Sequence, residues 1–378
     1  MHYCFDYISP ELKSILEPAT QQCHFTGEKL QVHEYPNGMI APFVDWKKSI
    51  GGILSHDGTV IKDSECKEWK ESDLYYSPAN AKTEDKTVIF LGFMPRAFGH
   101  AFNDCLRKIW FINCDFCRCL LEEGAEFVYT AQENETLPSY FFETFRLAGF
   151  ELSQARQITE LTRFKSVIVP ENCVIAEDDG RVYTNEYKQL IDNVVHSIPR
   201  AGEGTYPKRV YFTRTHIKSS KEQGEQAIEQ QFKRLGYTII SPELYPVTTQ
   251  IDIVRDCTHF AATEGSVAHH SLFCKPGTKV TLINKANYLN MHQVMINEFA
   301  DLDVTYVEAH HSSRANKECP WWGPFYMCVT RYLEEYVGHR ILHLPYWMKI
   351  SYWRYSQNFI MRAFHTIKRP IFHFLGKG

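Results

Sequence analysis

The segment Thr263–His270, with the sequence TEGSVAHH, brings a carboxylate, a hydroxyl and two imidazoles together within one short stretch. Ser266 could be the nucleophile of a serine hydrolase, although only part of the G-x-S-x-G turn of such enzymes is present. The segment could instead hold a phosphate, because Gly265 would let a ligand approach and a helix starting at Ser266 would offer unpaired N–H groups, including that of Val267. A plain N-cap role for Ser266 is compatible with phosphate binding. The phosphate-binding interpretation is favoured.

A second group of candidates lies in the segment FGHAFNDCLRKIW, residues 98–110. His100 and Asp104 are four residues apart, so on a helix they share one face. A histidine and a carboxylate placed in this way could accept a proton from a substrate hydroxyl, either together or through the carboxylate alone. The alternative is a helix cap and an ordinary surface aspartate.

A third group surrounds the predicted strand 209–214, in the segment KRVYFTRTHIKSSK. Arg214 ends this strand, where a guanidinium group could hold a diphosphate through two hydrogen bonds, and Arg209 begins it. For the neighbouring lysines, solvated surface charge is the better interpretation.

Two patterns that resemble metal sites are discounted. Cys114, Cys117 and Cys119 have the spacing of zinc ligands, but they fall inside a predicted helix and lack a second pair. Asp301 and Asp303 have the form of a metal–nucleotide carboxylate pair, which is common by chance. The sequence therefore predicts no metal site, and the scattered cysteines are expected to be free thiols in a reducing compartment.

The elements that must position these residues alternate between strand and helix, which predicts an α/β fold. The segment PRAGEGTYPK, residues 199–208, is the best linker in the chain. Four parts are expected: a β-rich or irregular lead-in (1–80), an α/β lobe (81–200), a second α/β lobe (201–335) and a C-terminal tail (336–378). In the second lobe, strands are predicted at 209–214, 237–242, 259–263 and 279–284, and helices at 220–236, 247–257 and 266–274.

The tail 336–378 interleaves aromatic residues with seven Lys/Arg and contains no Asp or Glu, whereas the whole chain has a formal net charge of −4. A basic, aromatic helix suits an anionic membrane surface; packing back over the two lobes is the alternative. The acidic body argues against nucleic-acid binding. No run is long and apolar enough to span a membrane, and the start does not resemble a secretory signal. A cytoplasmic protein, in contact with the inner face of the membrane through its tail, is expected.

The order of these features resembles the family 61 glycosyltransferases, inverting enzymes of the GT-B type. The segment at 98–110 is similar to the family's first-lobe pattern of His, Asp four residues later, Leu and Trp. The region 209–284 is similar to the family's second-lobe pattern of two arginines flanking a strand, a Glu-led helix ending in Gly, a Gln-bearing helix, a small-residue turn and Phe-x-x-Pro-Gly. In this chain the matching residues are Arg209, Arg214, Glu225, Gly236, Gln250, Gly265 and Phe273–Gly277. One departure is Glu264-Gly265-Ser266, where many members have His-Gly-Ala.

The resemblance implies two Rossmann-like lobes facing a cleft, with a nucleotide-sugar, expected to be UDP-linked, in the C-terminal lobe. Its diphosphate would lie on Gly265, Ser266 and Val267, neutralised by Arg209 and Arg214. Asp104 is the first choice of base, Glu264 the second and His100 the third.

No obligate cofactor or metal is expected beyond the nucleotide-sugar substrate. The acceptor would be a glycan or a lipid-linked glycan in bacterial surface-polysaccharide synthesis, such as a capsule or lipopolysaccharide. The alternatives are a serine hydrolase that uses Ser266 and a non-catalytic protein that binds a nucleotide or sugar.

Overall fold

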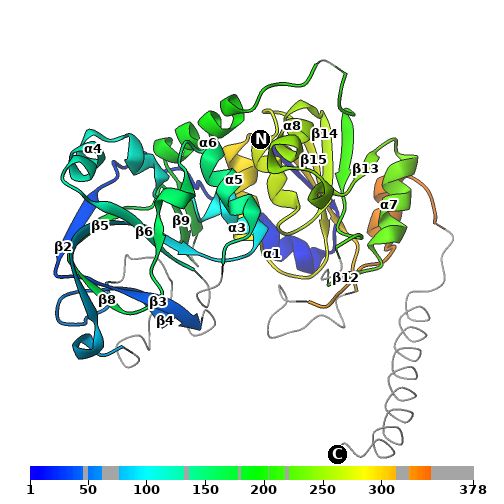
Figure 1. Ribbon diagram of the computed structural model, residues 1–378. Helices are drawn as coiled ribbons and strands as arrows, with labels where there is room; N and C mark the ends of the chain where they lie inside the picture. The colour runs from blue at the N-terminus through cyan, green and yellow to red at the C-terminus, as the bar shows by residue number, and fades with distance from the viewer. Residues whose placement is uncertain are drawn as a thin grey trace, which may run out of the picture.

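The computed structural model describes residues 1–45, 50–61, 76–131, 136–177, 180–202, 204–217, 221–311 and 323–341. It is an α/β structure built on two large sheets that lie side by side (Figure 1). The tail beyond residue 341, with its predicted membrane contact, lies outside the described residues. No helix in the described part of the chain has the length and apolar character needed to cross a membrane.

The second half of the chain forms a six-stranded sheet in which every neighbouring pair is parallel. Its strands, in spatial order, are β13 (Thr238–Ile240), β11 (Arg209–Phe212), β14 (His259–Thr263), β15 (Lys279–Asn284), β16 (Asp303–Glu308) and β1 (His2–Tyr7). The strands β11, β13, β14, β15 and β16 can be numbered 1 to 5 in chain order. Their spatial order is then 2-1-3-4-5, which is a doubly wound arrangement. The order reverses between β11 and β14, so the carboxyl ends of these two strands open a crevice for a ligand.

Helices cover both faces of this sheet, because alternate strand residues point to opposite sides. Val210 and Phe212 face the core shared with α8 and η7, whereas Tyr211 faces the core shared with α7 and α10. The helices of this half are α7 (Glu225–Arg234), α8 (Val247–Asp256), the 3₁₀ helix η7 (Ala268–Phe273), α9 (Met291–Phe299) and α10 (Arg331–Val337).

The first half forms a seven-stranded mixed sheet. In spatial order its strands are β4 (Ile50–Leu54), β3 (Met39–Asp45), β8 (Thr162–Pro170), β5 (Lys82–Met94), β6 (Glu126–Ala131) and β7 (Arg156–Gln157), with β2 (Val32–Pro36) also paired to β8. The β5–β8, β5–β6 and β6–β7 pairs are parallel, and the pairs made by β2 and β3 are antiparallel. The helices of this half are α3 (Phe98–Asn103), α4 (Asp115–Glu122), α5 (Ser139–Leu147) and α6 (Asn185–Ser197), whereas α1 (Pro10–Thr20) follows β1 and contacts α9 of the second half. In Figure 1, α3 and α5 lie between the two sheets.

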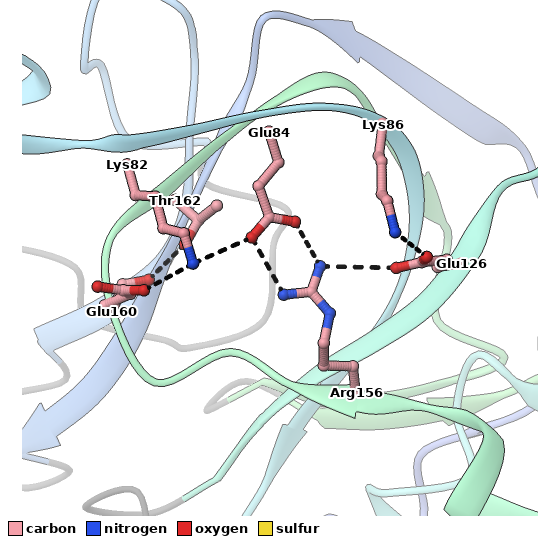
Figure 2. A network of polar contacts seen from close by, with 7 residues as sticks. All are labelled: Lys82, Glu84, Lys86, Glu126, Arg156, Glu160 and Thr162. Atoms are coloured by element: carbon pink, nitrogen blue, oxygen red, sulfur yellow. Dashed lines mark hydrogen bonds and ion pairs between the residues drawn. The ribbon is translucent and has the colours of Figure 1, made fainter.

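A network of charged side chains spans β5, β6 and β7 of this sheet (Figure 2). Arg156 lies 2.7 Å from Glu84 and 3.6 Å from Glu126, which also pairs with Lys86. Each of these side chains except Glu84 is more than a third exposed, so solvent screens the network.

The first 80 residues differ from the predicted separate lead-in. Residues 2–7 form an edge strand of the second sheet, paired with β16, and residues 32–54 supply three strands of the first sheet. β4 pairs locally with β3, but the partners of β1, β2 and β3 in β16 and β8 lie more than 100 residues away, which is why a local pattern did not indicate them. Tyr336, at the start of the predicted tail, also packs into the second half, where its hydroxyl lies 2.8 Å from that of Thr281.

Candidate active site

A cavity of about 490 Å³ opens at the crevice between β11 and β14. Its walls come from both halves of the chain, with α3 and α5 on one side and the loops after β11, β13 and β14 on the other. The lining residues are Ala97, Phe98, Ser139, Tyr140, Glu143, Arg214, Ile217, Pro242, Glu243, Tyr245, Pro246, Val247, Gln250, Ser266, Val267 and His270. Three predicted donor-site residues, Arg214, Ser266 and Val267, therefore lie on one cavity.

Arg214 is held at the cavity wall by buried charges. Its Nε lies 3.3 Å from Oε2 of Glu222, whose Oε1 accepts a hydrogen bond at 2.5 Å from Lys285. Glu222 and Lys285 are only 2% and 6% exposed, so this is a buried pair with the half-buried Arg214 at its rim. Burial lowers the pKa of Lys285, and the Glu222 carboxylate opposes that change. Two cations, Arg214 and Lys285, therefore flank the Glu222 carboxylate at the carboxyl edge of the sheet, and Glu264 also lies close enough to act on Lys285.

Gly265 lies directly over this pair. Its φ of +121° belongs to a backbone region that other residues rarely adopt, and a Cβ atom there would come within 3.0 Å of Lys285 Nζ. The glycine therefore brings the turn backbone close to a buried ammonium group.

The helix predicted to start at Ser266 is wrong in its type and in its first residue. It is the six-residue 3₁₀ helix η7, which begins at Ala268. The Ala268 N–H donates to Gly265 O at 2.8 Å and is not available to a ligand, whereas the N–H groups of Ser266 and Val267 have no hydrogen-bond partner among the described residues. Since a short 3₁₀ helix offers little dipole, positive charge at this turn has to come from side chains.

Glu264 lies beneath the turn and is 1% exposed. It accepts a hydrogen bond at 2.9 Å from Asn284, at the end of the neighbouring strand β15. Burial raises its pKa to about 7, while Lys285 and the bond from Asn284 act in the opposite direction. The structure thus places this candidate base behind the cavity wall.

The structure does not bring Arg209 to the cavity. It begins β11, paired with His259 at the start of β14, and its guanidinium lies 4.6 Å from the centre of the Tyr237 ring. Because the strands are parallel, their amino ends all lie at one edge of the sheet and their carboxyl ends at the other. Arg209 starts β11 and lies at the amino edge, whereas Arg214 lies at the carboxyl edge. Asp301 and Asp303 lie at the same amino edge, next to Met1 and His2.

His100 and Asp104 do form the predicted pair, with Nδ1 of the histidine hydrogen-bonded to Oδ2 of the carboxylate. His100 lies within α3, whereas Asp104 is the C-cap, because α3 ends at Asn103. The sequence has a helical pattern from about Gly99 to Leu121, but in the structure this stretch is divided into α3, a 3₁₀ turn (Ile109–Asn113) and α4. Neither residue lines the cavity, but Gly99 beside them touches its wall, since a Cβ there would lie 2.6 Å from Ser266 Oγ.

The discounted cysteines lie on or beside α4, with Cys117 buried and Cys119 exposed. All ten cysteines of the described residues are free thiols.

Three residues near these groups were missed from the sequence. Lys285 follows β15 directly, and Arg214 lies two residues after β11, which ends at Phe212 rather than at Arg214, so a charged residue just after a strand was an available signal. Asn103 donates to Gly99 O at 2.8 Å and lies 2.9 Å from His269, joining α3 to η7. His292, on α9, lies 3.6 Å from Asp104, and nothing in its local sequence indicated that contact.

A doubly wound sheet with a cavity at its switch point, and an arginine on the cavity wall, is an arrangement found in α/β proteins that bind phosphorylated ligands. The family described as Glycosyltransferase 61 matches residues 98–281, from the first residue of α3 to the middle of β15. Through these residues the chain belongs to glycosyltransferase family 61, and it is a glycosyltransferase. No curated protein matches it.

Proposed function

We propose that the protein transfers a sugar, with inversion, from a nucleotide-sugar, expected to be UDP-linked, to a glycan or lipid-linked glycan. The observation that carries this proposal is the cavity at the β11–β14 crevice, with Arg214 on its wall and Lys285 beneath Gly265. The sugar would be a hexose, a pentose or an N-acetylhexosamine. A bacterial surface polysaccharide, such as a capsule or lipopolysaccharide, is the proposed product.

The donor diphosphate would lie against Arg214 and the Gly265–Val267 turn. Glu222 fixes the orientation of the guanidinium, and Lys285 adds charge from below. Preformed donors of this kind stabilise the negative charge that develops on a departing diphosphate. Arg214 and Lys285 supply that charge, so we propose that transfer needs no divalent ion. Activity that is lost in EDTA and restored by manganese would overturn this point.

Asp104 is the proposed base. It would take the proton of the acceptor hydroxyl as the hydroxyl oxygen bonds to the anomeric carbon and the carbon–oxygen bond to the diphosphate breaks. His100, bonded to Asp104, would hold the carboxylate in place and is the third choice of base. Glu264 is the second choice, although its side chain is only 1% exposed and lies behind the cavity wall.

We also propose that the two sheets represent the two lobes of a GT-B-like enzyme, with the donor on the second lobe and the acceptor on the first. The residues from α3 and α5 on the cavity wall support this division. The tail from 342 onward would bring the enzyme to an anionic membrane that carries the acceptor. Truncation at 341 should then abolish flotation with anionic liposomes, and equal flotation of both forms would contradict it.

Nothing supports the serine hydrolase alternative. Among the described residues no histidine is hydrogen-bonded to Ser266, whose Oγ faces Gly99. A fluorophosphonate probe would label a hydrolase and should leave this protein unmodified. A non-catalytic binding protein would bind UDP but show no donor turnover.

Calorimetry of UDP binding tests the donor site. Arg214→Ala should weaken binding by roughly 10- to 100-fold, because a hydrogen bond to a charged group contributes about 1.5–3 kcal/mol. Arg209→Ala is the matched control, since it removes the same side chain from the other end of the same strand. Unchanged affinity in Arg214→Ala, or an equal loss in Arg209→Ala, would refute the assigned site.

A further inference from the structure

Three side chains with metal-binding atoms meet beside the cavity. They are His100 and Asp104, from the end of α3, and His292, from the first turn of α9. One ligand atom from each lies within 4.8 Å of the other two. His292 Nε2 is 3.6 Å from Asp104 Oδ2, and His100 Nδ1 is hydrogen-bonded to that same oxygen.

The chemistry of this set suits a transition-metal ion. Two imidazoles and one carboxylate with a position left open is a common ligand set for Zn²⁺, Fe²⁺ and related ions, and it differs from the all-oxygen sets of Mg²⁺ and Ca²⁺. Zn–N and Zn–O bonds of about 2.0–2.2 Å in a tetrahedron place neighbouring ligand atoms about 3.4 Å apart. The distance from His292 to Asp104 is close to that value.

Burial favours retention of an ion at this place. Asp104 and His292 side chains are only 8% and 12% exposed, whereas His100 is 38% exposed and leaves a path to solvent. A third imidazole lies next to the set, since the ring centre of His269 is 5.6 Å from that of His292.

The three residues come from different halves of the chain. The helix α3 follows β5 of the seven-stranded sheet, and α9 follows β15 of the six-stranded sheet. An ion held by all three would therefore link the two halves directly, next to the wall formed by Gly99 and Ser266.

We propose that His100, Asp104 and His292 form a binding site for a transition-metal ion of the Zn²⁺ class. The ion would take the place of the hydrogen between His100 Nδ1 and Asp104 Oδ2, and the neutral imidazole would carry its N–H on Nε2 instead. One consequence rests on the proposed function: a metal-bound Asp104 is no longer able to accept the acceptor's proton, and the ion inhibits transfer.

Binding is tested by titrating metal-free, full-length protein with zinc in a calorimeter, and with Co²⁺ while the visible absorption of the tetrahedral ion is followed. One ion per chain is expected. His292→Gln and Asp104→Asn should each weaken binding at least tenfold, whereas His196→Gln, which changes an exposed histidine on α6, should bind as the wild type does. Equal affinity in all four proteins, or no binding to the wild type, would overturn the site.

Two further measurements distinguish lost binding from misfolding and test the effect of the ion on transfer. Melting without metal identifies a variant that fails to fold, and for folded variants only the wild type and His196→Gln should melt at a higher temperature when zinc is added. Transfer should be slowed by zinc and not by EDTA. If zinc binds through the three residues without slowing transfer, the metal site stands and Asp104 is not the base.

Discussion

Two clusters of charged side chains among the described residues, one on strands and one mostly just after strands, differ in their exposure. The network on β5, β6 and β7 is solvated, with Arg156 41% and Lys86 49% exposed, and its charges pair with one another (Figure 2). The cluster behind Gly265 is buried, with Glu222 and Lys285 at 2% and 6%. Exposed pairs contribute about 0–1 kcal/mol each, whereas taking charges out of water costs several kcal/mol per ion. Only the buried cluster has this desolvation cost, and it lies next to the cavity. We therefore associate the buried cluster with ligand binding.

The largest contrast is expected from removing one lysine of each cluster. Lys285→Met leaves the buried Glu222 with Arg214 as its remaining cation and should lower the free energy of unfolding by about 3–5 kcal/mol. Lys86→Met, the matched change in the exposed network, should lower it by less than about 1 kcal/mol. Urea unfolding of both variants measures the difference, and equal losses would remove the distinction between the two clusters.

A somewhat smaller effect, dependent on pH, is expected from Glu264→Gln. The pKa of Glu264 is raised by burial to about 7 in the folded protein, so its stabilising contribution is complete below its ordinary pKa of 4.5 and is lost as the pH rises through about 7. The wild type should therefore lose of the order of 3 kcal/mol relative to Glu264→Gln between pH 4.5 and pH 7. If the free energies of unfolding of the two proteins change equally with pH over this range, the raised pKa of Glu264 is contradicted.

The smallest expected effect comes from two glycine substitutions, which distinguish the cost of backbone strain from the effect of contact with the buried cluster. Gly265→Ala and Gly124→Ala both place a side chain at a positive φ, +121° and +93°, and each should cost about 1–2 kcal/mol of stability. The new Cβ at 265 meets Lys285 Nζ, whereas the one at 124 has open space. Only Gly265→Ala should also weaken UDP binding, and calorimetry on both variants checks this.

The strands of the second sheet were largely predictable, because compact apolar runs bounded by turn residues specify buried parallel strands. The run HFAAT coincides with β14, and KVTLIN with β15. The helix at 266–274 was predicted with the wrong type, since apolar spacing over nine residues does not distinguish an α-helix from a 3₁₀ helix.

The candidate site was only partly predictable. Arg214, Ser266 and Val267 followed from their places after strands, and the contact between His100 and Asp104 followed from their spacing. Arg209 was assigned to the donor site although the direction of its strand places it at the other edge of the sheet. His292 could not be identified from the sequence, because its contact with Asp104 joins residues 188 positions apart in the chain.

The pairing of β1 with β16 also has a consequence for synthesis on the ribosome. His2 faces Asp303, so the strand made first has to wait for a partner made about 300 residues later. At roughly 5–20 residues per second, β1 would remain without this partner for about 15–60 s. During this interval its alternating sequence, HYCFDY, is an open strand edge that other chains could join. The last step in completing the second sheet is therefore the return of the first segment of the chain.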